Sequence, residues 1–425
     1  MSSPWSIQPI KSLVLWMARG AHPQYAEDTG FWIVNQGTIS SYQLAPDRMR
    51  ECEPLTGHKG RFQAGDLLIA STGEGVLGKC ALTAVAGYCD SHVSIVRSRT
   101  PNDAEFLYWW LAGNYETVNS LCALGSTKQT ELQKAAFLSH RIAMPDRSGR
   151  VAISKFLRNE CRILDARTEA LAEKRRLLTE LKASVREEFC FGRLQAEPRS
   201  TSQVAWHGKL PSRWPLERLG NLFQERAEFG YSDLPVLSVS IHSGISDKEL
   251  GDHETTRKVS RSEDKRIYKR VLPGDVVYNQ MRAWQGGFGV AKVEGLVSPA
   301  YVVARPRKKT SPNFVEHLLR TPRAIEEMRR RSRGIIDFRL RLYWDEFKDI
   351  VIPLPPYAEQ VDIAAKIDAR IEIIDDQISL IDEMASAMLA QRRALIFDAI
   401  TGRSTPGSLF ATKGGSISAT ALEQE

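Results

Sequence analysis

The chain has 425 residues, of which 42% are hydrophobic and 26% are charged, and its formal net charge is +7. A chain of this length exceeds one hydrophobic core, so we expect a folded protein of two or more domains. It has no apolar run near the roughly 18 residues of a membrane span and no signal-peptide core, which predicts a cytoplasmic protein without a membrane partner. Its positive net charge favours a polyanionic partner.

The first globular domain is expected over residues 1–145. A β-rich run at residues 66–70 follows a Gly-Asp turn, and residues 104–120 have the composition of a helix. A long first spacer helix is then predicted over residues 150–192, with Gly192 as its stop. Short strands mixed with helices indicate an α+β domain.

Apolar residues recur at seven-residue intervals along this long helix. They are Leu157, Leu164, Leu171, Leu178 and Val185. Heptad spacing sustained over five positions predicts coiled-coil packing rather than a helix that merely lies on a surface.

The second half has the same order of elements. A polar connector is expected over residues 193–211 and a second globular domain over residues 212–355, with a Gly-Asp turn before residues 276–278 and a helical stretch at residues 313–331. A second long helix is predicted over residues 358–402, followed by a flexible tail, residues 403–425, rich in Ser, Thr and Gly. Its heptad residues are Ile367, Ile374, Ile381, Met388 and Leu395.

The two halves are copies of one module. At an offset of 347 − 137 = 210 residues, segments 137–193 and 347–403 share ten identical residues among 57 positions. Because 210 is a multiple of seven, the offset preserves the heptad phase. We therefore expect two repeated mixed domains joined by two long antiparallel coiled-coil helices with approximate two-fold symmetry, and two similar surfaces for a partner.

Residues typical of catalysis or metal binding form no convincing site in the sequence. The six cysteines contain no Cys-x-x-Cys pair and there is no His-Glu-x-x-His, so we expect no metal, no bound cofactor and no catalytic residue. Gly73, Gly78 and Lys79 match a phosphate-binding loop, but Cys80 stands where that loop needs a magnesium-binding hydroxyl. Leu354 of Leu-Pro-Pro-Tyr cannot hold a target amine as the first residue of a methyltransferase loop does.

Basic residues interleaved with amides and aromatics indicate DNA binding in both domains. Arg, Asn and Gln contact base edges, whereas Lys and Arg neutralise phosphates. In the first domain the candidates for DNA contact are Lys59, Arg61, Ser71, Thr72, Lys79, Ser126, Thr127, Lys128 and Gln129. In the second they are Asn279, Gln280, Arg282, Trp284, Gln285, Arg329, Arg330, Arg331, Arg333, Arg339 and Arg341, beside a further basic segment at residues 305–309. We expect Gln280 and Arg282 to read bases and Arg330 to contact phosphate.

The linker and helix of the second half have a characteristic order of residues. Ile352-Pro-Leu-Pro-Pro-Tyr-Ala-Glu-Gln360 precedes the heptad helix, which ends at Thr401-Gly402-Arg403. With its repetition, this order resembles the specificity subunit of type I restriction–modification systems over nearly the whole chain. In the first copy the pattern has drifted, since Gly149-Arg150 replaces Glu-Gln and Asp146 replaces the second proline.

The resemblance implies two target recognition domains that each read half of a split sequence in double-stranded DNA, with the helices setting the gap. It implies no catalysis by this chain, which would dock two modification subunits and, through them, restriction subunits. S-adenosylmethionine, ATP and magnesium are expected on those partners. Ile371, Ile378 and Leu380 are candidate docking residues. A coiled-coil adaptor that binds proteins instead of DNA, and a nucleotidase or methyltransferase, are the alternatives.

Overall fold

The computed structural model describes residues 5–40, 42–55, 57–73, 76–122, 131–194, 197–240, 244–245, 265–334 and 340–403. They divide into two compact units, which are treated separately below: unit 1 is Met1–Leu171 with Glu383–Glu425, and unit 2 is Ala172–Asp382. Residues 404–425 of the expected tail, residues 126–129 and Arg339 lie outside the described residues.

Two long helices each have one part in either unit. They are α4 Arg147–Cys190 and α9 Tyr357–Thr401. In unit 2 they run antiparallel, because Arg175 pairs with Asp382 at 2.8 Å and Lys182 pairs with Asp375 at 2.5 Å. The two ion pairs are one heptad apart on both helices (182 − 175 = 382 − 375 = 7), as coiled-coil packing requires.

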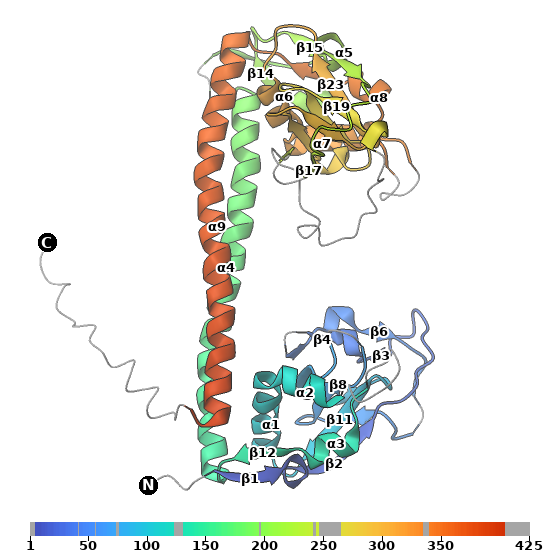
Figure 1. Ribbon diagram of the computed structural model, residues 1–425, viewed down its shortest axis with the longest axis vertical. Helices are drawn as coiled ribbons and strands as arrows, with labels where there is room; N and C mark the ends of the chain where they lie inside the picture. Colours follow the sequence, from blue (N-terminus) through green and yellow to red (C-terminus); the bar gives the residue numbers. More distant parts are fainter. Residues whose placement is uncertain are drawn as a thin grey trace, which may run out of the picture. The chain divides into compact units, whose positions relative to one another are not determined.

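Helices α4 and α9 lie side by side within each unit (Figure 1). Heptad residues Leu157 and Leu395 contribute to the core of unit 1, and Leu178, Val185, Ile367 and Ile374 contribute to that of unit 2. In unit 1 Leu157 and Leu164 are buried, and Arg392 of α9 donates a hydrogen bond to Asp165 of α4 at 3.0 Å. In unit 2 the buried heptad residues are Val185, Ile367, Ile374 and Ile381. The half-buried heptad residues are Leu171, Leu178, Met388 and Leu395. The expected fold class, mixed domains with two coiled-coil helices, is confirmed.

Unit 1 is built on a four-stranded antiparallel sheet with strand order β2-β11-β8-β9. These strands are β2 Val14–Arg19, β8 Leu67–Ala70, β9 Cys80–Leu82 and β11 Val93–Ser98. Leu67 and Ile69 of β8 face the core shared with the helices, whereas Leu68 and Ala70 face a second core. Both faces of this central strand are therefore covered, which explains its uninterrupted apolar sequence.

Short strand pairs and single-turn helices surround this sheet. The pairs are β1 Ser6–Pro9 with β12 Arg141–Met144, β3 Trp32–Ile33 with β6 Arg50–Glu51, β4 Ile39–Ser40 with β5 Gln43–Leu44, and β7 Arg61–Phe62 with β10 Gly87–Tyr88. The short helices are η1 Ile10–Ser12, η2 Gln36–Thr38, η3 Pro46–Arg48 and α3 Lys134–Ser139.

The single helix predicted at residues 104–120 is wrong, because two helices occupy this region. They are α1 Pro101–Gly113 and α2 Tyr115–Cys122. The side chain of Asn114 donates a hydrogen bond to the Trp110 carbonyl at 2.9 Å and ends α1 there. Gly113 permits close packing against α9, since a Cβ at this position would lie 2.4 Å from Ile400 Cδ1.

Unit 2 contains a second four-stranded sheet with the equivalent order β16-β23-β20-β21. Its strands are β16 Phe223–Arg226, β20 Val276–Asn279, β21 Phe288–Val290 and β23 Tyr301–Pro306. The pairs around it are β13 Arg199–Thr201 with β14 Lys209–Pro211, β15 Leu216–Arg218 with β24 Val351–Pro353, β17 Val239–Ser240 with β18 Gly244–Ile245, and β19 Lys269–Val271 with β22 Gly295–Val297. The polar segment 193–211 thus contains a hairpin, β13 and β14.

The helix predicted at residues 313–331 is also divided, into α6 Pro312–Leu319 and α7 Pro322–Arg331. Proline has no N–H to donate, so Pro322 begins a new helix instead of continuing the first. The Thr321 hydroxyl accepts a hydrogen bond from the Ala324 N–H and caps it. The remaining short helices are η4 Ala205–His207, α5 Leu219–Leu222, η5 Lys265–Ile267, η6 Ala283–Gln285 and α8 Trp344–Lys348.

One end of each sheet is closed by a buried carboxylate from the Gly-Asp turn. Asp66 accepts hydrogen bonds from Arg97 at 2.8 and 2.7 Å, and Asp275 accepts two from Arg305 at 2.9 Å. Both aspartates are 1% exposed and both also accept a backbone N–H from three residues earlier. Arg305, part of the basic segment 305–309, therefore has a structural partner.

The Glu-Gln of the second linker joins α9 to the globular part of unit 2. The Gln360 amide, 1% exposed, accepts hydrogen bonds from the Ser311 N–H at 2.9 Å and the Thr310 hydroxyl at 3.1 Å, and donates to the Pro355 carbonyl at 2.7 Å. Glu359 accepts two hydrogen bonds from Arg213 at 2.7 and 2.8 Å.

The first linker, whose sequence differs, connects α4 to the globular part of unit 1 through other groups. Arg150 occupies the position of Gln360 (360 − 150 = 210), donates to the Pro145 carbonyl at 2.9 Å and pairs with the buried Asp103 at 3.0 Å. A guanidinium thus replaces an amide at the junction between domain and helix.

Replacing Gln360 with alanine should destabilise unit 2 by about 1–3 kcal/mol, because the Ser311 N–H and the Thr310 hydroxyl would be buried without a partner. Urea unfolding followed by circular dichroism measures the change. Asp376→Ala, an exposed change on the same helix, is the control. Equal stability of the two variants would contradict the structural role of Gln360.

Candidate nucleic-acid interface

Three connections of unit 1 meet at the end of the sheet opposite Asp66. The residue after β8, Ser71, donates its N–H to the His92 carbonyl at 2.8 Å, and its own carbonyl accepts the Leu132 N–H at 2.9 Å. These bonds hold the loop after β8, the loop before β11 and the segment around residue 131 together. We call this end of the sheet the loop edge of unit 1.

Unit 2 has the same arrangement at the equivalent place. Gln280 follows β20, donates its N–H to the Ala300 carbonyl at 3.3 Å and accepts the Leu342 N–H at 2.9 Å. The offsets from unit 1 are 280 − 71 = 209, 300 − 92 = 208 and 342 − 132 = 210. The sequence repeat therefore extends into the loops, and the loop edge of unit 2 is built as that of unit 1 is.

Polar side chains cluster on the loop edge of unit 1. The Thr72 hydroxyl lies 2.8 Å from Gln36 Oε1 and 2.8 Å from His92 Nδ1. Ser91 Oγ lies 3.0 Å from Nδ1 of His22. Hydroxyl, amide and imidazole groups of this kind both donate and accept hydrogen bonds, as contact with base edges requires.

The buried carboxylate of Asp90 holds parts of this cluster in place through hydrogen bonds. Asp90 is 2% exposed and accepts hydrogen bonds from the His92 N–H at 2.9 Å and the Tyr25 hydroxyl at 3.0 Å. Burial raises the pKa of Asp90. Burial and the neighbouring Asp90 also raise the pKa of Tyr25 to about 12, so this hydroxyl stays protonated near neutral pH and remains a donor. The Arg50 guanidinium lies 3.8 Å from the Tyr25 ring centroid.

The loop edge of unit 2 presents the turn between β20 and β21. Asn279 Oδ1 accepts the Met281 N–H at 2.9 Å, and Trp284 Nε1 donates to the Met281 carbonyl at 3.0 Å. These bonds fix the turn and leave the side chains of Arg282 and Gln285 exposed. No ion pair joins Arg282 to another of the residues that the structure describes, so its guanidinium is available for a bidentate contact with guanine.

The other predicted arginines of unit 2 divide into two groups. Arg341 lies beside this turn, because the N–H of the next residue, Leu342, bonds the Gln280 carbonyl, and its own backbone pairs with that of Arg333. Its side chain is exposed. Arg330 and Arg331 instead donate to Glu327, which is 6% exposed, at 2.8 and 2.5 Å.

Two further arginines from the prediction also have partners. Arg333 forms an ion pair with Glu346, and Arg329 interacts within the protein as well. Gln280 is half-buried by its loop contacts. The arginines expected to contact phosphate therefore contribute to the structure of unit 2.

The predicted residues of unit 1 are not all at the surface. Ser71 is fully buried, and its hydroxyl lies 2.6 Å from Ser94 Oγ, so its backbone, not its side chain, serves the loop edge. Lys59 and Arg61 are exposed on either side of Gly60, whose carbonyl accepts the Cys89 N–H at 2.9 Å. Lys79 is half-buried at the end of the loop that begins with Thr72.

The sequence prediction missed several residues near the loop edge of unit 1. Trp32 is 54% exposed and lines a hollow of about 460 Å³ with Tyr25, Met49, Arg50 and acidic side chains. Gln36 and His92 bond Thr72 from separate loops. These residues are far apart in the chain and belong to no motif, so folding alone brings them together.

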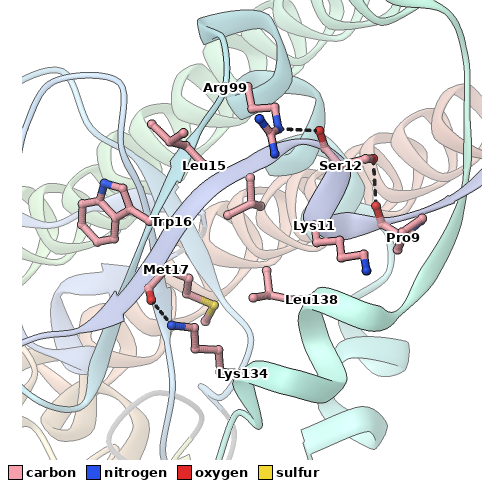
Figure 2. A pocket seen from close by; sticks show the side chains of 10 residues that line it. Pro9, Lys11, Ser12, Leu15, Trp16, Met17, Arg99, Lys134 and Leu138 are labelled. Atoms are coloured by element: carbon pink, nitrogen blue, oxygen red, sulfur yellow. Dashed lines mark hydrogen bonds between the residues drawn. The ribbon is translucent and has the colours of Figure 1, made fainter.

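A second hollow, of about 550 Å³, lies along the edge strand β2 (Figure 2). Arg99 Nε donates to the Ser12 carbonyl at 3.1 Å, and Lys134 Nζ donates to the Met17 carbonyl at 2.5 Å. Lys11 is a third cation among the lining residues, which include no carboxylate. The hollow adds positive charge to unit 1 outside its loop edge.

Other kinds of site were also sought in the structure. Among the described residues, no group of three or more His, Cys, Asp or Glu side chains is placed to hold a metal ion. Within the same part of the chain, no helix has the length and apolar character needed to cross a membrane. The described free cysteines are all buried: Cys52, Cys80, Cys89, Cys161 and Cys190. Strand β9, not a helix, follows the Gly-rich segment that ends at Lys79.

No family model and no curated protein matches the sequence. Solved structures do resemble it. A chain of a type I R-M system, determined to describe complex assembly and conformational transition, matches with a TM-score of 0.60 at 17% identity, covering 94% of this chain and 98% of that chain. The HsdS subunit from Thermoanaerobacter tengcongensis matches with a TM-score of 0.48 at 16% identity over 94% and 97% of the two chains. The type I restriction-modification S subunit from M. genitalium matches with a TM-score of 0.42 at 15% identity, covering 93% of this chain and 96% of that chain.

At such low identity a structural likeness establishes the fold, and the match with a TM-score of 0.60 carries that conclusion. The protein has the fold of this matching chain of a type I restriction–modification system.

Proposed function

We propose that this chain is the specificity subunit of a type I restriction–modification complex and binds a bipartite sequence in double-stranded DNA. The observation that carries the proposal is the repeated loop edge, built on the backbone of Ser71 in unit 1 and of Gln280 in unit 2. Each edge presents donors and acceptors of a different kind, so one chain would read two different half-sites.

The chemistry of the two edges supports direct contact with base pairs. Exposed Arg282 and Gln285 in unit 2 have the fork and amide geometries that pair with guanine and adenine in the major groove. Thr72, Gln36 and His92 in unit 1 form a hydrogen-bonding group with no arginine in it. The net charge of +7 would strengthen binding to the phosphate backbone.

The helices supply surface for protein partners, which we propose are modification subunits and, through them, restriction subunits. On α9, Ile373 is 61% and Leu380 is 58% exposed, and their spacing of seven residues places them on one helix face. Ile371 and Ile378 pack against the core of unit 2, so Leu380 alone of these three predicted docking residues is exposed.

In this proposal the chain has no catalytic role. S-adenosylmethionine, ATP and magnesium would be held by the modification and restriction subunits. Mapping adenine methylation in a host that carries this chain with its modification subunit tests the proposal, and a split motif methylated in both halves is expected. A complex that assembles but shows no sequence-dependent binding to duplex DNA would instead favour the adaptor function.

Replacing Arg282 with alanine should relax the preference for one base pair in the half-site read by unit 2. The expected loss is about 5- to 100-fold in affinity for the preferred pair, the range for one bidentate contact, with the other half-site unchanged. Arg218→Ala removes the same charge from β15 and serves as the control. Binding of the assembled complex to duplexes altered at single positions measures both, and equal effects would contradict base readout by Arg282.

Introducing aspartate at Ile373 and Leu380 should prevent association with the modification subunit, because the partner's apolar surface would face buried charges. Ser379→Asp adds a charge at the neighbouring exposed position and is the control. Size-exclusion chromatography of the mixed subunits, with circular dichroism to verify folding, gives the result. Normal assembly of the double variant would exclude this face as the docking surface.

Inserting one heptad into α4 after Leu171 and one into α9 after Asp382 tests whether the helices set the gap between half-sites. Seven residues add about 10 Å of helix, close to three base pairs of DNA, and preserve the seam. Methylation mapping should then report the same half-sites with a gap about three base pairs longer. An unchanged gap would show that the helices do not set this distance.

A further inference from the structure

The Thr72 side chain links two groups that could each face a base. Its hydroxyl oxygen lies 2.8 Å from Gln36 Oε1 and 2.8 Å from His92 Nδ1. The Gln36 amide is held against Gly73, where a Cβ would lie 3.0 Å from Oε1 and 3.1 Å from Nε2. Gln36 Nε2 and His92 Nε2 form no hydrogen bond with other described residues, and His92 is exposed. We call this group the Gln36–Thr72–His92 relay.

The relay couples the donor and acceptor roles of its two ends, because a hydroxyl has one hydrogen. If His92 Nδ1 carries the proton, it donates to Thr72, and Thr72 donates to Gln36 Oε1. The free groups are then one donor, the Gln36 amide nitrogen, and one acceptor, His92 Nε2. If the chain of hydrogen bonds runs the other way, with the amide turned over, the free groups are again one donor and one acceptor.

One donor beside one acceptor is the complement of adenine. In the major groove adenine presents N7 as an acceptor and its amino group as a donor, whereas guanine presents two acceptors, N7 and O6. Protonation of His92 puts a hydrogen on both ring nitrogens. Thr72 must then donate to Gln36 Oε1, and the free groups become two donors, the complement of guanine.

Several titratable groups lie around His92. The buried carboxylate of Asp90 accepts the His92 backbone N–H at 2.9 Å. The other titratable groups nearby are Tyr25, which bonds Asp90, and His22, which contacts Ser91. Glu131 pairs in the backbone with Thr72, while its carboxylate forms a 2.6 Å ion pair with Arg19.

Resting on the proposed function, we propose that the Gln36–Thr72–His92 relay reads one base pair of the half-site bound by unit 1, and that protonation of His92 shifts its preference from adenine toward guanine. Imidazole is the side chain that changes charge between about pH 5 and 8, so the shift falls within a range where the complex is testable.

The test uses the full chain assembled with its modification subunits and duplexes that carry each base pair in turn at every position of the mapped half-sites. Affinities are measured at about pH 8 and pH 6 at constant ionic strength. At one position of the half-site assigned to unit 1, the affinity for guanine relative to adenine should rise by about tenfold on acidification, within the range for one base contact. Positions in the other half-site should show no such change.

Three variants separate the relay from a general effect of pH. His92→Gln removes the titrating group and should abolish the shift, whereas His58→Gln, an exposed histidine of the same unit, should retain it. Gln36→Leu removes the other end of the relay and should lose the preference between adenine and guanine at both pH values.

The outcomes distinguish the relay from the proposed function. Sequence-specific binding with a pH-independent base preference would overturn the relay and leave the proposed function intact. A shift that persists in His92→Gln would do the same. The absence of sequence-dependent duplex binding at both pH values would overturn the proposed function and the relay together.

Discussion

The loop edge of each unit depends on two backbone hydrogen bonds made by a single residue. Ser71 and Gln280 each donate to the loop before β11 or β23 and accept from the segment near residue 131 or 341. Backbone groups buried at such a junction must be paired, and pairing them fixes three loops at once. Side chains on these loops are then free to differ between the units, because the bonds that hold the loops do not involve them.

The two junctions between domain and helix meet one requirement with different residues. In both linkers a proline carbonyl needs a donor, and Gln360 supplies an amide where Arg150 supplies a guanidinium. Their other partners differ: the Gln360 amide oxygen accepts from a backbone N–H and a hydroxyl in unit 2, whereas the Arg150 guanidinium donates to the Asp103 carboxylate in unit 1. The first linker has therefore lost its sequence motif while retaining the connection that the motif provides.

A basic residue at the surface of this protein is not necessarily available to bind a ligand. Arg305 closes the sheet of unit 2 through Asp275, and Arg330 neutralises the buried Glu327, although both occur in runs of basic residues. Arg282 lies in no such run and is exposed on the loop edge. In unit 1 the corresponding surface depends on Thr72, whose hydroxyl links an amide to an imidazole.

The sequence by itself determined the fold class, the repeat and the phase of the two long helices, because heptad spacing and an offset of 210 residues depend only on residue order. It also identified Arg282 as a candidate for contact with a base. It did not reveal that Asn114 and Pro322 divide helices, since their effects depend on local capping. Only the tertiary structure decided that Ser71 is buried and that Gln36, Thr72 and His92 meet. Contacts between residues so far apart in the chain arise from strand pairing and loop packing, which leave no local pattern to read.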